Sequence, residues 1–334
     1  MEYKKFELNI RDNIRALKNI NKNQQDIFFN GLEKKSEKNL TDVKKIFFES
    51  LKPKERLSSI HNACGILLRI FDQICRTHNL SYWIMAGTLI GAVRTGNPIP
   101  WDDDFDIGMT AGDYYKFFDL VNNGVSPHIH LEITPIFKLG RLHFKHIIRF
   151  KCNEGTISST GRGAFIDIFI HNYCDDVSPG TLKSMKEFRK GIRLYLYNTY
   201  HKELSKYTDT KTRSERIIQI LKDDADLIFE EKYFTSGDRS KGALAFSTIA
   251  STGWFTEKFS FPSSYIFPLK DINYCDFKVM APNECEKSLK ESYGDIYYLP
   301  NDILTHKHIT KSNYENHIAS LKDVISEIKK QYGW

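Results

Sequence analysis

The sequence predicts an α+β fold, in which a mixed β-sheet is flanked by helices and followed by a helical C-terminal part. Three observations support this prediction. Apolar residues recur at helical spacing in residues 55–78, short apolar runs typical of strands occur between residues 81 and 171, and helical patterns return after residue 182. With 334 residues, 41% of them hydrophobic, the chain is long enough to bury a large core.

Residues 1–52 form a polar extension in which two apolar clusters, 27–29 and 46–48, predict short helices. After Pro53, the segment Glu55–His78 predicts a long helix with one buried stripe. The apolar residues of that stripe are Leu57, Ile60, Cys64, Leu67, Leu68, Phe71 and Ile74.

The predicted sheet lies within residues 53–180. A strand at 81–87 leads into a helix that we expect to begin at Thr88, and the prolines of residues 97–100 end this helix. The remaining predicted elements of this region are a strand at 102–109, a helix at 112–123, and strands at 130–138, 141–151 and 164–171.

Helical patterns dominate residues 181–334. They extend from Leu182 to Tyr233, with an interruption near residues 208–214, and a last helix is expected at Tyr314–Tyr332.

The overall charge is mildly basic. The 48 basic and 42 acidic residues give a net charge of +6. This excess would suit a polyanionic partner or an anionic membrane surface, but it is also typical of an ordinary solvated surface, which we favour. Basic residues interleaved with aromatic ones do not form an obvious nucleic-acid surface, so no nucleic-acid partner is predicted.

The six cysteines are scattered without a CxxC pair, which is typical of reduced residues in the cytosol. The N-terminus lacks the apolar centre of a signal peptide, and no stretch approaches the roughly 20 apolar residues of a membrane span. These features predict a cytoplasmic protein.

The run WDDDFD at residues 101–106 places four carboxylates close together. Side chains on a strand alternate between faces, so Asp102, Asp104 and Asp106 are predicted to share one face. Their mutual repulsion would be offset most simply by a divalent cation, Mg²⁺ or Mn²⁺. A solvated acidic turn is the alternative, and the apolar neighbours favour the metal site.

Gly87 and Thr88 precede this run, where the predicted strand meets the helix. A glycine allows close approach of a ligand, and a helix N-terminus offers free N–H groups, so this junction would bind a phosphate. Thr88 would add its hydroxyl, unless it only caps the helix. Arg94 could reach the same phosphate, or it could be a surface cation at the helix end.

Asp167 interrupts the apolar run GAFIDIFIH. A buried carboxylate is costly unless it is paired or bound to a metal, so Asp167 is the predicted third acid beside Asp104 and Asp106. Pairing with an arginine is the alternative. Arg162, shortly before it, is a candidate for contacting a phosphate or a glycan.

Weaker candidates remain along the chain. Arg141, His143 and Lys145 alternate on one strand and could meet a diphosphate, but a solvated face is the favoured interpretation. His306 and His308 are interpreted as polar loop residues, and Tyr293 as a structural residue.

The segment GTLIGAVRTGNPIPWDDDFDIGM at residues 87–109 resembles the signature of the LicD family, which includes bacterial phosphocholine and alditol-phosphate transferases and the animal fukutin-type proteins. The run FIDIF at 165–169 and residues 267–300 resemble later parts of the same family. The resemblance covers about residues 57–300. It implies a nucleotidyltransferase-like core at 53–180 and a C-terminal segment within 181–334 that packs on it.

The resemblance also implies an activity. A substituted phosphate, phosphocholine or an alditol phosphate, would move from a CDP-activated donor such as CDP-choline to a sugar hydroxyl, and CMP would leave. The acceptor would be a sugar or lipid-linked glycan of a lipopolysaccharide, capsule or teichoic acid, which allows peripheral association with the inner face of the membrane.

By the same resemblance, Asp104 and Asp106 would hold the metal. Asp167 would join a second metal or accept the acceptor proton, and Asp102 would hold metal-bound water or substrate. Residues 1–52 would cap the sheet or help to bind the acceptor.

Two other classes of function remain open at this point. A true nucleotidyltransferase would move NMP from an NTP, and a binding protein would keep the fold without catalysis. The residues Trp101 to Asp103 and the C-terminal segment, which resemble the LicD family, argue against the first alternative, and the intact acids argue against the second.

Overall fold

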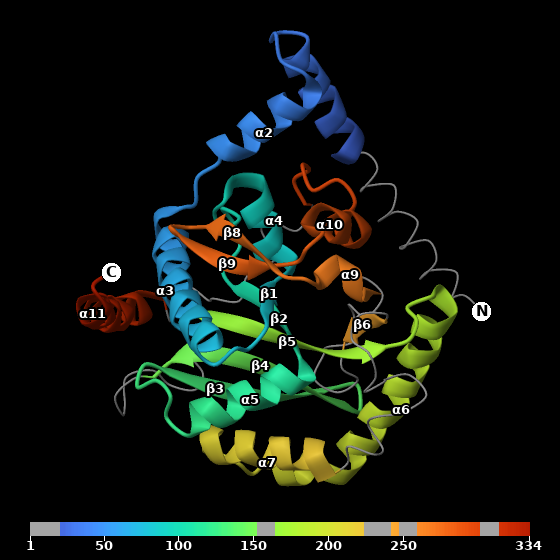
Figure 1. Ribbon diagram of the computed structural model, residues 1–334, viewed down its shortest axis with the longest axis vertical. Coiled ribbons are helices and arrows are strands. Elements are labelled where there is room, and N and C mark those ends of the chain that lie inside the picture. The colour runs from blue at the N-terminus through green and yellow to red at the C-terminus, as the bar shows by residue number, and fades with distance from the viewer. Residues whose placement is uncertain (1–20, 152–163, 224–241, 247–258, 301–313) are drawn as a thin grey trace.

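A computed structural model describes residues 21–151, 164–223, 242–246, 259–300 and 314–334. Within them, a mixed sheet has the central order β1-β2-β5-β4-β3, and β6 pairs with both β5 and β7 (Figure 1). The β2–β5 pair is parallel and the other pairs are antiparallel. The strands are β1 (Tyr82–Ile84), β2 (Phe105–Thr110), β3 (Ile129–Lys138), β4 (Arg141–Phe150), β5 (Phe165–Cys174), β6 (Ala243–Phe246) and β7 (Phe261–Pro262).

Helices surround this sheet, and a separate two-stranded hairpin packs near β1. The helices are α2 (Leu40–Ser50), α3 (Glu55–Thr77), α4 (Ala86–Thr95), α5 (Ala111–Asn122), α6 (Pro179–Leu204), α7 (Thr210–Asp223), α9 (Ser263–Ile266), α10 (Cys285–Tyr293) and α11 (Tyr314–Tyr332). The hairpin consists of β8 (Lys270–Tyr274) and β9 (Phe277–Ala281). The predicted α+β class, a mixed sheet with flanking helices, is confirmed.

The long helix α3 forms the centre of the core. Its predicted stripe is buried from Ile60 to Ile74, and Phe71 makes edge-to-face contacts with Tyr82 of β1 and Phe117 of α5 at 4.8 and 4.9 Å. Aromatic contacts of this kind add to the free energy gained by burying apolar area. The helix therefore fixes β1, and with it the start of α4.

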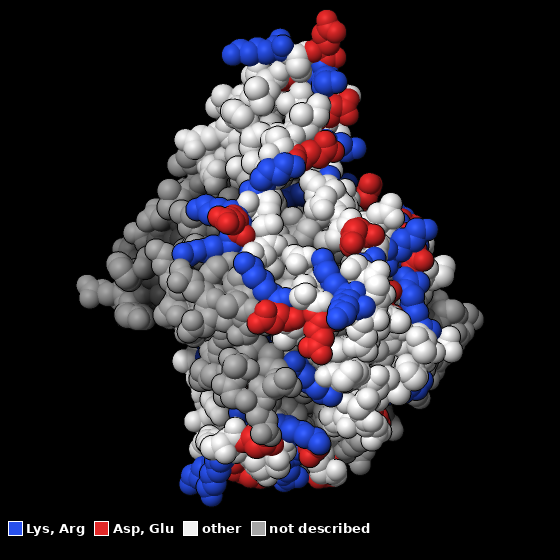
Figure 2. All heavy atoms as spheres, turned by 90° about the vertical axis from the view of Figure 1, so that its left-hand side faces the viewer, with Lys and Arg blue, Asp and Glu red and all other residues white. Residues whose placement is uncertain are grey.

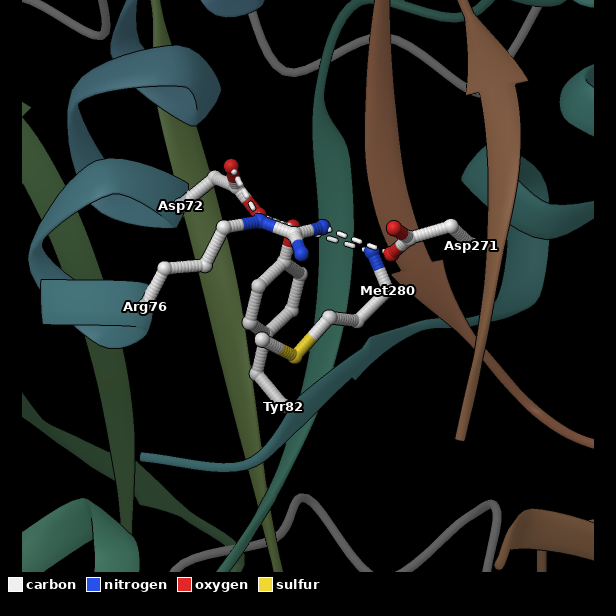
Figure 3. Close-up of polar contacts among 5 residues, drawn as sticks. All are labelled: Asp72, Arg76, Tyr82, Asp271 and Met280. Atoms are coloured by element: carbon white, nitrogen blue, oxygen red, sulfur yellow. Dashed lines mark hydrogen bonds and ion pairs between the residues drawn. The ribbon is translucent and has the colours of Figure 1, made fainter. Parts of the chain in front are cut away.

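A polar network fastens the β8–β9 hairpin to α3 and β1 (Figure 3). The Tyr82 hydroxyl donates to Asp72 at 2.7 Å and accepts from the backbone N–H of Met280 at 3.3 Å. Arg76 donates to Asp72 at 2.8 Å and to Asp271 of β8 at 2.7 Å. Because the bonds to Asp271 and Met280 join residues nearly 200 positions apart, they place the C-terminal hairpin against the sheet.

The structure corrects two predicted boundaries and, among the described residues, adds four strands, β6 to β9, in the part that was expected to be helical. Helix α4 begins at Ala86, two residues before the expected Thr88. Strand β2 begins at Phe105 and not at Asp102, because the N–H of Asp102 donates to the carbonyl of Ile99 in a turn. The β8–β9 hairpin was not expected within a helical C-terminal part.

Helix α2 extends away from the sheet at the top of Figure 1 and contacts α4 at its base. Lys44 pairs with Asp295 at 2.9 Å, and the ring of Phe48 meets Tyr297 at 5.8 Å. The N-terminal and C-terminal parts of the chain therefore meet beside α4.

The surface in Figure 2 carries lysine and arginine interspersed with aspartate and glutamate. Among the described residues, no helix combines the length and the apolar character needed to cross a membrane.

Gly108 provides a test of this packing. It lies opposite Trp83 in the β1–β2 register, and a Cβ at this position would overlap the indole ring. We expect Gly108→Ala to lower the free energy of unfolding by about 1–3 kcal/mol, the usual cost of overpacking. Gly112→Ala is the control, because a Cβ there meets nothing within 4 Å. Urea unfolding curves compare the two variants, and equal stabilities would contradict the packing described here.

Candidate active site

The parallel pairing of β2 with β5 places Asp106 directly beside Asp167. Asp104 lies two residues before Asp106, just ahead of β2. Each of the three carboxylates offers an oxygen, and these oxygens lie within 4.8 Å of one another. The structure therefore brings together the three acids that the sequence singled out.

Asp102 and Asp103 form a second group that shares Asp104. The three oxygens that these residues offer also lie within 4.8 Å of one another. This arrangement differs from the strict alternation predicted for residues 102–106, in which Asp103 faced away. The reason is that residues 102–104 precede β2 and do not follow the alternation of a strand.

Gly87, in the first turn of α4, faces this acidic group. A Cβ at Gly87 would overlap Oδ2 of Asp102 and would lie 3.7 Å from Oδ2 of Asp106. The absence of a side chain therefore allows the N-terminus of α4 to approach the carboxylates. The positive end of the helix dipole stabilises negative charge there.

Two hydrogen bonds fix the acidic segment. The hydroxyl of Thr88 accepts the backbone N–H of Asp106 at 2.7 Å, so Thr88 holds β2 against α4 and does not cap the helix. Nε2 of His61 lies 2.7 Å from the carbonyl oxygen of Asp102. Because a carbonyl only accepts, this nitrogen carries the proton.

The environment raises the pKa of Asp106 well above its usual value. Desolvation is the largest cause, and the charges of Asp104, Asp167 and Asp102 act in the same direction, whereas Lys145 acts against them. The carboxylates thus repel one another in a poorly solvated place, as predicted from the sequence.

Lys145 of β4 contacts the acids from the neighbouring strand. Its Nζ lies 2.8 Å from Oδ2 of Asp167 and 4.7 Å from the centroid of the Phe165 ring. The sequence left Lys145 as a weak candidate, because the register that brings it to Asp167 could not be deduced from the strand alone.

Arg94 lies in the last turn of α4, about 9 Å along the helix axis from Thr88. Its guanidinium stacks over Phe48 at 4.5 Å and donates to the carbonyl of Tyr298 at 3.3 Å. The structure therefore joins Arg94 to α2 and the C-terminal segment, and its predicted role at the donor phosphate stays a prediction. Arg162, His306 and His308 lie outside the described residues.

Two tyrosines of the C-terminal segment also approach the acids. Tyr274 is fully buried with its ring 5.3 Å from Phe105, and the charges of Asp102 and Asp106 help to raise the pKa of its hydroxyl, after burial and Cys275. Burial also raises the pKa of Tyr293, and the same acidic group adds to this shift. Sequence reasoning did not single out Tyr274 and interpreted Tyr293 as structural, since only the tertiary structure brings β8 and α10 to the acids.

The residues present fit a hard divalent cation. Mg²⁺ prefers carboxylate oxygens and keeps positions for water and substrate phosphates, and Asp104, Asp106 and Asp167 offer three such oxygens at close range. A glycine and a helix N-terminus beside them suit a phosphate group. This combination is typical of a nucleotidyltransferase-like site.

Comparison with known proteins agrees with this class. The family model described as the LicD/FKTN/FKRP nucleotidyltransferase domain matches residues 79–177. Residues 79–177, which include β1 to β5 and the three acids, are therefore similar to the nucleotidyltransferase domain of this family.

Curated relatives match over similar stretches. The chain is 32% identical over 111 residues to the lipopolysaccharide cholinephosphotransferase LicD of Haemophilus influenzae, covering 33% of this chain and 42% of that protein. It is 30% identical over 136 residues to an uncharacterized protein of Rickettsia typhi, covering 39% and 40%. The chain thus spans about two fifths of the length of these relatives.

The raised pKa of Asp106 predicts how stability depends on pH. Well below its usual value of 3.8, Asp106 is protonated in both the folded and the unfolded state. As the pH rises, the unfolded chain releases the proton first, so the folded state loses stability until the pH passes the raised folded pKa. Asp106→Asn should remove this loss and raise the free energy of unfolding at pH 8 by about 1–2 kcal/mol.

This gain should shrink towards pH 4, and urea unfolding in chelator at both pH values measures it. Asp119→Asn, an exposed change on α5, is the control and should show no such pH dependence. A stability difference for Asp106→Asn that is the same at both pH values would contradict the electrostatic explanation.

Proposed function

We propose that the protein is a metal-dependent phosphotransferase. It moves a substituted phosphate, phosphocholine or an alditol phosphate, from a CDP-activated donor to a sugar hydroxyl of a surface glycan. The cluster of Asp104, Asp106 and Asp167 beside Gly87 is the observation that carries this proposal. The name of the Haemophilus relative, a lipopolysaccharide cholinephosphotransferase, supports phosphocholine as the group and lipopolysaccharide as the class of acceptor.

In this proposal Asp104, Asp106 and Asp167 hold Mg²⁺ or Mn²⁺, which when bound neutralises charge on the diphosphate. The chain supplies the geometry. Gly87 leaves room for a phosphate at the first turn of α4, and Thr88 keeps Asp106 in register with it. The backbone carbonyl of Asp102 is held by His61, and the carboxylate of Asp102 lies beside Gly87.

The reaction forms a bond between the acceptor oxygen and the phosphorus that bears choline or the alditol. The bond from that phosphorus to the bridging oxygen breaks, and CMP leaves with the electron pair. The acceptor hydroxyl loses its proton, for which Asp167 is the candidate base unless it serves a second metal.

The surroundings of the site supply the remaining roles. Residues 1–52 are proposed to cap the fold or to contact the glycan, and α2 already lies against α4. The protein would act in the cytoplasm, where a lipid-linked acceptor would bring it to the inner face of the membrane.

The alternative is transfer of NMP from an NTP, a reaction that the name of the matched nucleotidyltransferase domain supports. The leaving group separates the two reactions. We expect CMP to be released from CDP-choline or a CDP-alditol when a glycan acceptor and Mg²⁺ are present, as measured by mass spectrometry. Pyrophosphate together with a nucleotidylated acceptor would favour the alternative.

Removal of one acid tests the metal mechanism. Asp104→Asn should lower the rate of CMP release by about 10³-fold or more, because metal-ion stabilisation of a transition state amounts to several kcal/mol. Chelation by EDTA should have the same effect reversibly, whereas the exposed Asp119→Asn should leave the rate unchanged. Full activity of the native chain in EDTA would contradict the mechanism.

A further inference from the structure

Lys145 lies on β4, a strand that supplies none of the three candidate metal ligands and no part of the phosphate junction at Gly87. It lies near the middle of β4, and its side chain is 25% exposed. Its ammonium group forms an ion pair with Asp167 at 2.8 Å while it lies against the ring of Phe165. The group is thus partly accessible on one side and bound to a candidate metal ligand on the other.

The charges at this point are nearly balanced for one divalent cation. When ionised, Asp104, Asp106 and Asp167 carry a formal charge of −3, and Lys145 adds +1, which leaves −2 before the neighbouring Asp102 and Asp103 are counted. The charge of Lys145 also opposes the rise in the pKa of Asp106. The positive charge of Lys145 therefore offsets part of the negative charge that a metal cation would otherwise neutralise.

An incoming divalent cation would change this balance. It would share Asp167 with an ammonium group of the same sign, and like charges at such distances repel by kilocalories even where water screens them. A lysine can relieve this repulsion because its charge sits at the end of a flexible four-carbon chain. The carboxylates of Asp104 and Asp106 are on shorter side chains, at the start of β2 and just before it, and cannot move as freely.

A diphosphate bound at the metal would offer Lys145 a new partner. Lysine binds phosphate as a point charge, without the fixed geometry that arginine requires. Arg149, four residues further along the same face of β4, is already held by Glu132 at 3.0 Å. Of these two cations, Lys145 is the one that contacts an acid of the site and could move from it to a bound phosphate.

We propose that Lys145 exchanges partners during binding, which rests on the proposed function. It neutralises Asp167 before metal and donor bind, and it moves to a phosphate oxygen of the donor once the metal has bound. Lys145 thereby makes metal binding and donor binding cooperative, because the metal releases the ammonium group that the phosphate needs.

The test uses the full chain with Mn²⁺ and CDP as probes. Free Mn²⁺ is measured by electron paramagnetic resonance, and CDP binding in saturating Mn²⁺ by calorimetry. Lys145→Met should bind Mn²⁺ about fivefold more tightly than the native chain, because a like charge is gone. The same variant should bind CDP about tenfold more weakly, because a charge-assisted bond to phosphate is lost.

Lys151→Met is the matched control. Lys151 follows the same strand about 20 Å away and donates to the carbonyl of Ser126, so its loss should change neither affinity. Lys145→Gln is a second variant in case the methionine variant does not fold, because its amide can still donate to Asp167. We expect both Lys145 variants to bind Mn²⁺ more tightly and CDP more weakly than the native chain.

The outcomes separate this inference from the proposed function. Weaker Mn²⁺ binding in the Lys145 variants would show that the lysine only positions Asp167, and unchanged CDP binding would show that it does not reach the phosphate. Either result overturns the exchange and leaves the metal site standing. If the native chain does not bind Mn²⁺, the metal site and the exchange are both rejected.

Discussion

The repulsion between Asp106 and Asp167 is the constraint on which the rest of the site depends. The parallel register of β2 and β5 makes these two residues neighbours, and Asp104 adds a third carboxylate. Such a group is stable in a poorly solvated place only if opposite charge or dipoles offset it. The ion pair from Lys145 and the N-terminus of α4 supply this offset in the absence of a metal.

Elements outside the matched domain complete this arrangement. Helix α3 contributes His61, which contacts the carbonyl of Asp102, β8 contributes Tyr274, and α10 contributes Tyr293. The network of Tyr82 and Asp72 fastens the hairpin that carries Tyr274. A domain of about a hundred residues therefore holds the acids, whereas the flanking segments determine what surrounds them.

The elements with strong periodic patterns were predictable from the sequence. The helix Glu55–Thr77 follows from its apolar stripe, and the final helix Tyr314–Tyr332 follows from the same period. The acids at 104, 106 and 167 were predictable because carboxylates in apolar strands are costly without a function.

Features that depend on register or on distant contacts were not predictable. The pairing of Lys145 with Asp167 requires the alignment of β4 with β5, and the role of Thr88 requires the contact of α4 with β2. The hairpin β8–β9 was missed, since its strands have only five residues each and pair with each other outside the main sheet. Short strands of this kind carry little pattern of their own.

The central claim is that Asp104, Asp106 and Asp167 together hold a divalent cation. The most direct measurement is the anomalous diffraction of crystals of the full chain grown with Mn²⁺ and CDP. The account predicts an anomalous peak within bonding distance of oxygens from all three carboxylates, with a phosphate oxygen on the side of Gly87. A peak confined to Asp102 and Asp103, or no peak at these acids at saturating Mn²⁺, would contradict it.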